Sequence, residues 1–349
     1  MTLSRRSRRR FLTCLVSALC GAAAAYFYTR ATVPPGRPDF ITWHTGVRIG
    51  FLIAGATSAF EVFVVYGTAG AALRRLPFLQ LLALRTGAHG TIIMTLLLLN
   101  MFVGQVLGED WAYDFHPKQF LGHFIFSLAG LTVALFIAQA HSLVGARAIT
   151  NLVLGRYHRP RKEERLFLLL DLKGSTPLSV RLGDARFHEL LSAVFFDIDG
   201  PITERGGEIY EYVGDAVIAS WRLGSLDREQ HAVNAVFAAR DALRQRSDWY
   251  RHQFDAVPEL RAVLHRGSVV AGECGASKRQ IVYRGETLNT IARLEGLAKA
   301  LSIDVLASDT GQAVNLPVGV LRDDLGSHEL RGLAAPVRVF SLVAANPTF

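Results

Sequence analysis

The sequence predicts two parts of different fold class: an α-helical four-span membrane domain, followed by an α+β domain of the ferredoxin-like βαββαβ type. Long apolar runs fill the chain before residue 146, whereas charged residues and short apolar runs dominate from Arg147 onward. After that change the pattern reads strand, helix, two strands, helix, strand, which is the ferredoxin-like order. We therefore expect a membrane domain over 1–145, a cytoplasmic connector over 146–165 and a second domain over 166–349.

Four apolar stretches are long enough to cross about 30 Å of hydrocarbon. They are Phe11 to Tyr28, Ile49 to Ala72, His89 to Leu107 and Phe120 to Val144. The segments at one end of these spans are basic: Arg5 to Arg10 precede the first span, and Arg74, Arg75 and Arg85 lie between the second and third. The loop between the third and fourth spans is acidic, with Glu109, Asp110 and Asp114. The positive-inside rule then predicts a multi-pass protein of the inner membrane, with both termini and the second domain in the cytoplasm.

The formal net charge is +8, and much of it lies in two clusters that flank apolar spans. This placement favours contact with anionic lipid of the bilayer over nucleic-acid binding. An alternative is that Ser7 to Leu12 forms a twin-arginine export signal, but three more spans follow and no clear small-residue cleavage site precedes Arg30. The three cysteines form neither a disulfide framework nor a zinc spacing, which is typical of a reducing compartment.

Ionisable residues within the predicted spans are candidates for function. Glu61 lies within the second span, where the simplest interpretation is a side chain that faces the bundle interior and is neutral or hydrogen-bonded. His89, His123 and His141 leave open a bound haem or a proton-sensing role, although they have no defined ligand spacing. Interior packing or interface polarity is the alternative interpretation of these histidines.

The second domain alternates short apolar runs with helical spacing. We expect a buried strand over Arg165 to Asp171, a helix to about Glu204, two strands within Glu208 to Trp221 that turn at Gly214 and Asp215, a helix over Leu226 to Arg244, strands at Leu260 to His265, Val269 to Glu273, Gln280 to Tyr283 and Ile303 to Ala307, and a helix over Thr287 to Ala300.

Two carboxylates end neighbouring strands of this prediction. Asp171 ends the first strand, and a tight turn at Gly174 leads into Ser175, with Thr176 as helix N-cap before a proline. Backbone N–H groups at such a helix start suit phosphate oxygens, and a carboxylate beside them suits Mg²⁺ or Mn²⁺. Asp215 lies in the turn that joins the next two strands. On the later helix Asn289 and Arg293 are spaced to share one face.

Three segments together resemble a class III nucleotidyl cyclase domain of the bacterial membrane-anchored type. They are Phe167 to Thr176, Gly207 to Val217 and Gly285 to Glu295, and the resemblance extends from about Arg165 to Leu342, including Glu329 to Gly332. The resemblance implies a homodimer with two composite sites, in which one subunit supplies the metal carboxylates and the other supplies the asparagine, the arginine and the base-selecting residues.

Carried over to this sequence, the resemblance makes Asp171 and Asp215 the carboxylates that hold two Mg²⁺ or Mn²⁺ ions, with the carbonyl of Leu172 as a further ligand. Asn289 would orient the ribose, and Arg293 would stabilise charge on the phosphate in the transition state. Arg331 falls where the family often has a lysine that binds the triphosphate.

The residues at the base-selecting positions do not form either of the family's usual pairs. Glu211 accepts hydrogen bonds and therefore favours guanine, whereas Val282 makes no polar side-chain contact. Bacterial relatives with this layout and an altered pair are regarded as adenylate cyclases, so the resemblance favours ATP, with GTP as the alternative. Three rivals remain: a diguanylate cyclase, a catalytically silent cyclase-like receptor, and a channel or transporter with a cytosolic regulatory domain.

Overall fold

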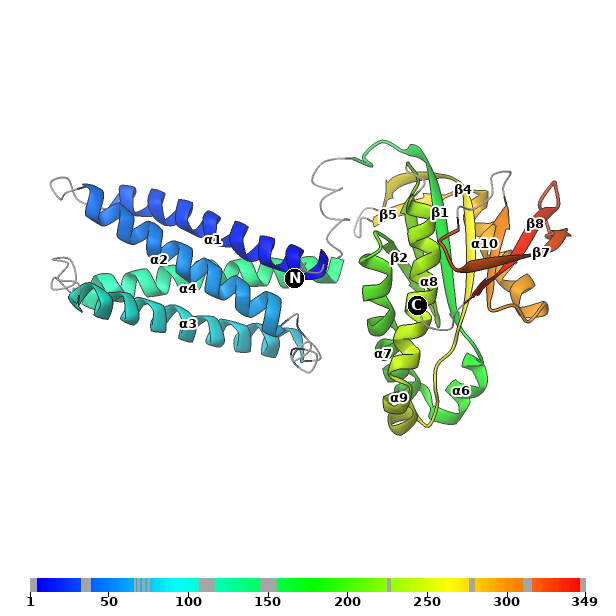
Figure 1. The fold of residues 1–349 in the computed structure, drawn as a ribbon, viewed down its shortest axis with the longest axis horizontal. Helices are drawn as coiled ribbons and strands as arrows, with labels where there is room; N and C mark the ends of the chain where they lie inside the picture. Colours follow the sequence, from blue (N-terminus) through cyan, green and yellow to red (C-terminus); the bar gives the residue numbers. More distant parts are fainter. Residues whose placement is uncertain are drawn as a thin grey trace. The chain divides into compact units, whose positions relative to one another are not determined.

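The computed structural model describes residues 5–32, 39–65, 67, 70, 73, 76–106, 117–144, 156–224, 227–275, 280–309 and 316–345. It divides the chain into two compact units, Met1–Ile149 and Thr150–Phe349. Figure 1 shows the first unit as long helices and the second as a sheet with helices on both faces.

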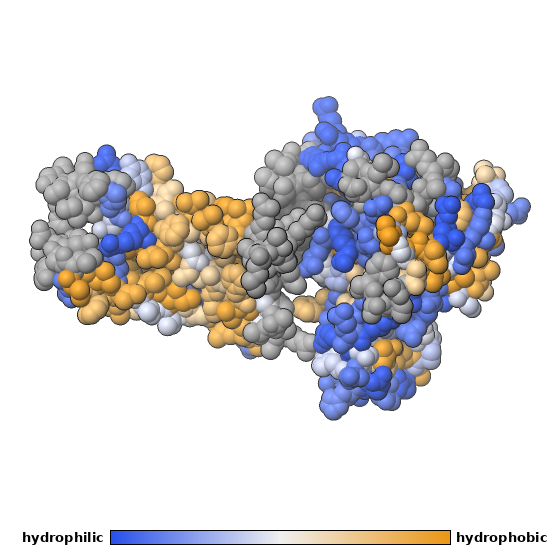
Figure 2. Space-filling view, in the orientation of Figure 1, coloured by the Kyte–Doolittle hydropathy of each residue, from blue (hydrophilic) through white to orange (hydrophobic). Residues whose placement is uncertain are grey.

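The described part of the first unit is helical throughout its long segments: α1 Arg5–Thr32, α2 Asp39–Ala59, the π-helix η1 Phe60–Val65, α3 Phe78–Val106 and α4 Pro117–Val144. Four helical segments are long and apolar enough to cross a membrane, namely Phe11–Ala31, His44–Val65, Phe78–Val106 and Phe120–Ile137. Apolar residues cover much of their visible surface in Figure 2. The four predicted apolar helices are therefore confirmed. The second ends earlier than predicted, at Val65, and the third begins earlier, at Phe78.

Arg85 lies inside α3, which corrects its assignment to a loop. Its Nε and Nη2 donate to the two carboxylate oxygens of Glu61 at 3.0 and 2.7 Å, and its Nη1 donates to Gln139 Oε1 at 3.3 Å. This bidentate pairing explains how an arginine is accommodated in an apolar helix. It also confirms that Glu61 faces the helix bundle and is hydrogen-bonded. The loop charges Arg74, Arg75, Glu109, Asp110 and Asp114 lie outside the described residues.

His89 belongs to the same polar cluster and is fully buried. Its Nδ1 lies 2.6 Å from the carbonyl oxygen of Arg85, and its Nε2 lies 3.4 Å from Glu61 Oε1. The side chains of His123 and His141 lie outside the described residues, so the haem hypothesis stays untested.

Helices α1 and α2 approach closely because glycines line their contact. A Cβ added at Gly21 would lie 2.3 Å from Ala54 Cβ, and one added at Gly50 would lie 2.4 Å from the Gly21 carbonyl oxygen. Small residues at such a contact are typical of helix packing in membranes.

The second unit is built on one mixed sheet in the order β2-β3-β1-β4-β6-β8-β7, with β5 paired to β4. The strands are β1 Arg161–Leu172, β2 Glu208–Val213, β3 Ala216–Arg222, β4 Leu260–Cys274, β5 Gln280–Arg284, β6 Val305–Asp309, β7 Val320–His328 and β8 Val337–Ala344. The strands β2, β3, β1 and β4 pair antiparallel, which is the arrangement of a ferredoxin-like fold. The predicted fold class is confirmed.

Strand β1 is central and buried on both faces, because successive strand residues point to opposite sides. Leu166, Leu168 and Leu170 enter one core, with residues of α7 Asp184–Thr203 and α8 Asp227–Gln245. Phe167 and Leu169 enter the other core, with residues of α10 Glu286–Ala300.

Several boundaries differ from the prediction. The strand β1 begins at Arg161 rather than Arg165, and the first helix is interrupted at Gly183, whose φ of 74° separates α6 Ser175–Leu182 from α7. The two strands expected between Leu260 and Glu273 form one strand, β4. The helix α9 Ser247–Phe254 and the strands β7 and β8 were not predicted.

The strand β4 pairs with β1 without a break on both sides of Gly267. This glycine pairs with Arg165 of β1, and a Cβ at this position would lie 2.4 Å from Thr287 Oγ1. The hydroxyl of Thr287 donates to the Ser268 carbonyl oxygen at 2.7 Å. Glycine therefore lets the start of α10 contact the strand directly.

Replacing Gly267 by alanine should therefore reduce the free energy of unfolding by about 1–3 kcal/mol, because the added methyl group overpacks the β4–α10 contact. Gly296→Ala is the matched control, since a Cβ there meets nothing within 4 Å and alanine favours the helix. Thermal or denaturant unfolding of the purified protein measures both. Equal stability of the two variants would contradict the close packing at Gly267.

Candidate active site

The two predicted carboxylates meet at one edge of the sheet. Asp171 near the end of β1 pairs with Ala216, the first residue of β3, and Asp215 precedes Ala216 in the β2–β3 turn. Gly214 in that turn has a φ of 60°, which glycine adopts readily. Asp171 is 5% exposed, and Asp215 is partly exposed. The structure therefore places a buried and a more accessible carboxylate side by side.

Burial raises the pKa of the Asp171 carboxyl; Lys299 opposes this shift and the nearby charge of Asp215 adds to it. Lys299 Nζ lies 3.1 Å from Asp171 Oδ2 and also pairs with Glu295. Among the described residues, Asp171 Oδ2 has no hydrogen-bond partner of good geometry beyond this ion pair. The sequence analysis missed Lys299, because only the packing of α10 on β1 brings its last turn to Asp171.

This pair suits a divalent cation. A buried carboxylate oxygen without a hydrogen-bond partner, next to a second carboxylate, supplies the hard oxygen ligands that Mg²⁺ and Mn²⁺ prefer. The described residues contain no group of three or more His, Cys, Asp or Glu side chains that could hold a metal ion. Further ligands would be backbone, water or substrate oxygens. Leu172 is the last residue of β1, and the role of its carbonyl stays a prediction.

The turn after β1 starts a helix, but not at the predicted residue. Gly174 has a φ of 64° and is the N-cap of α6, which begins at Ser175, so Thr176 lies inside the first turn. The left-handed conformation of Gly174 starts the helix early. No side chain caps this end among the described residues. The first backbone N–H groups of a helix have no partner within the helix, so those here are available for an anion.

Lys173 holds this turn in place from its other side. Its backbone N–H donates to the Glu259 carbonyl oxygen at 2.9 Å, and its ammonium pairs with Asp304. Asp304 also accepts from Arg240 Nη2 at 2.6 Å. The sequence analysis gave Lys173 no role.

Asn289 and Arg293 lie on α10, and Asn289 is remote from the carboxylates. Asn289 is exposed, and Arg293 is partly buried, with no hydrogen-bond partner for its Nη1 among the described residues. The rise of 1.5 Å per residue places Asn289 about 15 Å along the axis from Lys299, which contacts Asp171. Arg293 lies against Gly332, where an added Cβ would be 3.2 Å from Nη2, so it is close to the segment of Arg331.

The strands that carry the two predicted base-selecting positions, β2 and β5, contact each other through two tyrosines although they are not neighbours in the sheet. Tyr210 OH accepts a hydrogen bond from the Tyr283 backbone N–H at 3.3 Å, and their rings are 4.7 Å apart. Glu211 follows Tyr210 in β2 and is exposed, whereas Val282 precedes Tyr283 in β5 and is half-buried. Each predicted position therefore lies next to a residue of this tyrosine contact.

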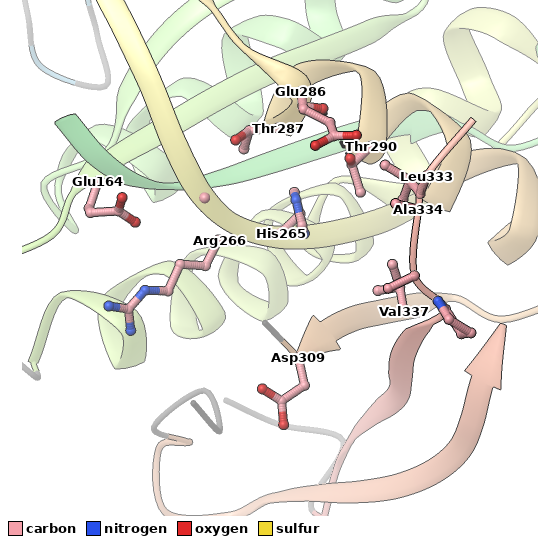
Figure 3. Close-up of a pocket in the computed structure, with 13 residues that line it drawn as sticks. Glu164, His265, Arg266, Glu286, Thr287, Thr290, Asp309, Leu333, Ala334 and Val337 are labelled. Carbon is pink, nitrogen blue, oxygen red and sulfur yellow. Dashed lines mark hydrogen bonds between the residues drawn. The ribbon is translucent and has the colours of Figure 1, made fainter. Parts of the chain in front are cut away.

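A separate cleft of about 920 Å³ contains none of the predicted site residues. Figure 3 shows it between the start of α10, the middle of β4 and the segment before β8. Its buried His265 lies 2.6 Å, through Nδ1, from Ser308 Oγ, and burial lowers the pKa of His265 to about 4. This histidine is therefore neutral at physiological pH.

Comparison with known proteins identifies the family of the second unit. Residues 159–342 match the family model of the adenylate and guanylate cyclase catalytic domain. The chain belongs to this family. It is 37% identical over 223 residues to adenylate cyclase 2 of Rhizobium meliloti (strain 1021), a match that covers 64% of this chain and 61% of the relative.

A second relative, the adenylate cyclase of Anabaena cylindrica, is 26% identical over 172 residues, covering 48% of this chain and 34% of the relative. The chain thus spans less than two thirds of the length of both relatives. A solved bacterial light-regulated adenylyl cyclase superimposes with a TM-score of 0.55 at 20% identity, over 67% of this chain and 68% of that one. At this identity the likeness concerns the fold.

Replacing Asp171 by asparagine should stabilise the metal-free protein at neutral pH. The pKa of the Asp171 carboxyl is higher in the folded than in the unfolded protein, so its contribution to stability is present at low pH and is lost as the pH rises. The amide of asparagine does not ionise, so the variant avoids this loss of stability. We expect the unfolding temperature to rise by about 2–4 °C at pH near 8, with a smaller rise near pH 5. The exposed Asp323→Asn is the matched control.

The same unfolding experiment with added Mn²⁺ tests the cation site. Wild type should be stabilised by Mn²⁺, and Asp171→Asn should respond less or not at all. An unfolding temperature of metal-free Asp171→Asn below that of wild type would contradict the raised pKa of Asp171. An equal shift of the unfolding temperature by Mn²⁺ in both proteins would contradict the cation site.

Proposed function

We propose that this chain is a membrane-anchored adenylate cyclase, which converts ATP to 3′,5′-cyclic AMP and pyrophosphate in a homodimer. The observation that carries the proposal is the pair Asp171 and Asp215 at one sheet edge, within a domain of the cyclase family. In the reaction the ribose 3′-oxygen loses its proton and forms a bond to the α-phosphorus. The bond between the α-phosphorus and the oxygen that bridges to the β-phosphate breaks, and pyrophosphate leaves.

The residues of the chain have distinct tasks in this proposal. Asp171 and Asp215 would hold two Mg²⁺ or Mn²⁺ ions, which would supply a lowered pKa for the 3′-hydroxyl and counter-charge for the triphosphate. The start of α6 offers backbone N–H groups to phosphate oxygens. Arg293, whose Nη1 lacks a hydrogen-bond partner among the described residues, donates to the phosphate in the transition state. Arg331 binds the triphosphate.

The distribution of these residues within one chain supports a homodimer. Asn289 is exposed, and it lies about 15 Å along α10 from the residue that contacts Asp171. Glu211 is exposed as well. We propose that the carboxylates of one protomer complete a site with Asn289, Arg293 and the base-selecting residues of its partner.

The base specificity rests on two opposing observations. Similarity to adenylate cyclase 2 of Rhizobium meliloti supports ATP. Glu211 supports GTP as the second candidate, because its carboxylate accepts hydrogen bonds from guanine N1 and N2. Val282 contributes no polar side-chain contact to either base.

The four apolar helices support anchoring in the bilayer. The charge distribution of the sequence supports the cytoplasmic placement of both termini and of the second unit. Membership of the cyclase family argues against a diguanylate cyclase. The ion pair of Glu61 with Arg85 gives Glu61 a structural role, so it no longer supports a channel. A catalytically silent receptor is the remaining rival.

Incubating the detergent-solubilised protein with Mn²⁺ and either ATP or GTP should yield cyclic AMP as the main product, measured by chromatography. Glu211→Lys should raise the ratio of ATP to GTP turnover by about tenfold, because a donor then faces the unprotonated adenine N1. Cyclic GMP as the main product would favour the guanylate cyclase. If neither nucleotide gives a cyclic product, the cyclase proposal is wrong and the catalytically silent receptor is the remaining function.

Mixing two inactive variants tests the shared site. Asp171→Ala and Arg293→Ala should each lose at least about a hundredfold in activity, since each removes a charged group from the site. Co-expression should restore activity, because half of the sites in a mixed dimer are then complete. Co-purification through two different affinity tags controls for heterodimer formation. Heterodimers without activity would refute the shared site.

A further inference from the structure

A buried arginine occupies the central strand at the end remote from Asp171. Arg165 is 2% exposed and lies on the same face of β1 as Asp171. Its Nε donates to Glu163 Oε2 at 3.0 Å, and its Nη1 donates to Glu208 Oε2 at 3.1 Å and to Ser220 Oγ at 2.9 Å. These bonds fix the plane of the guanidinium.

The same guanidinium lies over an aromatic ring. Arg165 Cζ is 4.5 Å from the centroid of the Tyr283 ring, which in turn contacts the ring of Tyr210 at 4.7 Å. Tyr283 belongs to β5 and is 7% exposed. A cation over the face of a desolvated tyrosine is attracted by the ring.

These contacts link strands that the sheet keeps apart. In the sheet, β3, β1 and β4 separate β2 from β5. Arg165 on the middle strand holds β2 through Glu208 and β5 through Tyr283. Glu211 and Val282 lie on these two strands, so both strands that carry the proposed base-selecting positions contact this arginine.

The connector reaches the same arginine. Tyr157 is 2% exposed; its hydroxyl donates to Glu163 Oε1 at 3.1 Å and accepts from Arg165 Nη2 at 3.4 Å. Its carbonyl oxygen accepts the Glu273 backbone N–H at 3.1 Å. The segment that precedes β1 is thus attached to the arginine and to β4.

We propose that Arg165 is a positioning residue for base recognition, which fixes the distance between Glu211 and Val282 and joins it to the connector through Tyr157. The inference rests on the proposed function, because it assigns Arg165 to the nucleotide-binding half of that site. Arg165 does not touch the substrate in this proposal; it acts through Glu208, Tyr283 and Tyr210.

Arg165→Lys tests the proposal in the full-length enzyme. Lysine keeps the positive charge beside the two glutamates but loses the planar fork and the stacking. We expect KM for ATP to rise on the order of tenfold, equivalent to about 1.4 kcal/mol of lost binding, with kcat within about twofold of wild type. The ratio of ATP to GTP turnover should change, and equilibrium binding of a fluorescent ATP analogue should weaken in parallel with KM.

Arg246→Lys is the matched control. Arg246 also pairs with a carboxylate, Asp197, and lies 4.1 Å from the ring centroid of Trp249, but it contacts neither β2 nor β5 through these partners. It should change KM and the nucleotide ratio by less than about twofold, even where it lowers the unfolding temperature as much as Arg165→Lys.

Tyr210→Phe serves if Arg165→Lys does not fold. It keeps the ring and removes the hydroxyl that accepts the Tyr283 N–H, so KM should rise about threefold. If Arg165→Lys keeps the wild-type KM and the wild-type ratio of ATP to GTP turnover, the inference is overturned while the cyclase function stands. If Arg165→Lys does not fold, the same result in Tyr210→Phe overturns the inference. Equal effects of Arg246→Lys would overturn it as well. A wild-type protein that neither binds nor cyclises nucleotide would overturn the proposed function itself.

Discussion

The second unit depends on the burial of β1 on both faces. Its even-numbered leucines pack under α7 and α8, and its odd-numbered residues pack under α10, so the strand is held from both sides. Because the strand is packed on both faces, the positions of its buried polar side chains within the domain are fixed. Asp171 at one end and Arg165 nearer the other are both nearly fully buried, and each retains charged neighbours that compensate its burial. The rigid apolar middle of β1 separates the proposed metal end from the base-recognition end.

The parts predicted from sequence are those that local patterns determine. The apolar run up to Asp171 and the turn at Gly214 and Asp215 are visible in a few consecutive residues, and strand pairing then brings the carboxylates together. Lys299 and Arg165 were missed because Asp171, Glu208 and Tyr283, the partners on other elements that give them their roles, are distant from them in the chain. The strand β7 was missed for a different reason: most of its residues are exposed at the sheet edge, so it carries little apolar alternation. The gap expected between the strands ending at His265 and starting at Val269 contains Gly267, a glycine that serves close packing against Thr287.

Asp171 has a counter-charge within its own chain. Lys299 pairs with the Asp171 carboxylate and also with Glu295. A divalent cation held by Asp171, as proposed above, would therefore compete with the Lys299 ammonium for this carboxylate. This competition involves the last turn of α10, the helix that also carries Asn289 and Arg293.

The Glu61–Arg85 pair has a consequence for how the protein is made. In the bilayer proposed for the first unit, η1 alone would expose a carboxylate to lipid and α3 alone would expose a guanidinium, and either charge is costly there. The two residues lie on consecutive helical segments, and their bidentate ion pair balances the two charges. In the proposed bilayer this pairing would favour insertion of the second and third helices together over insertion of either one alone.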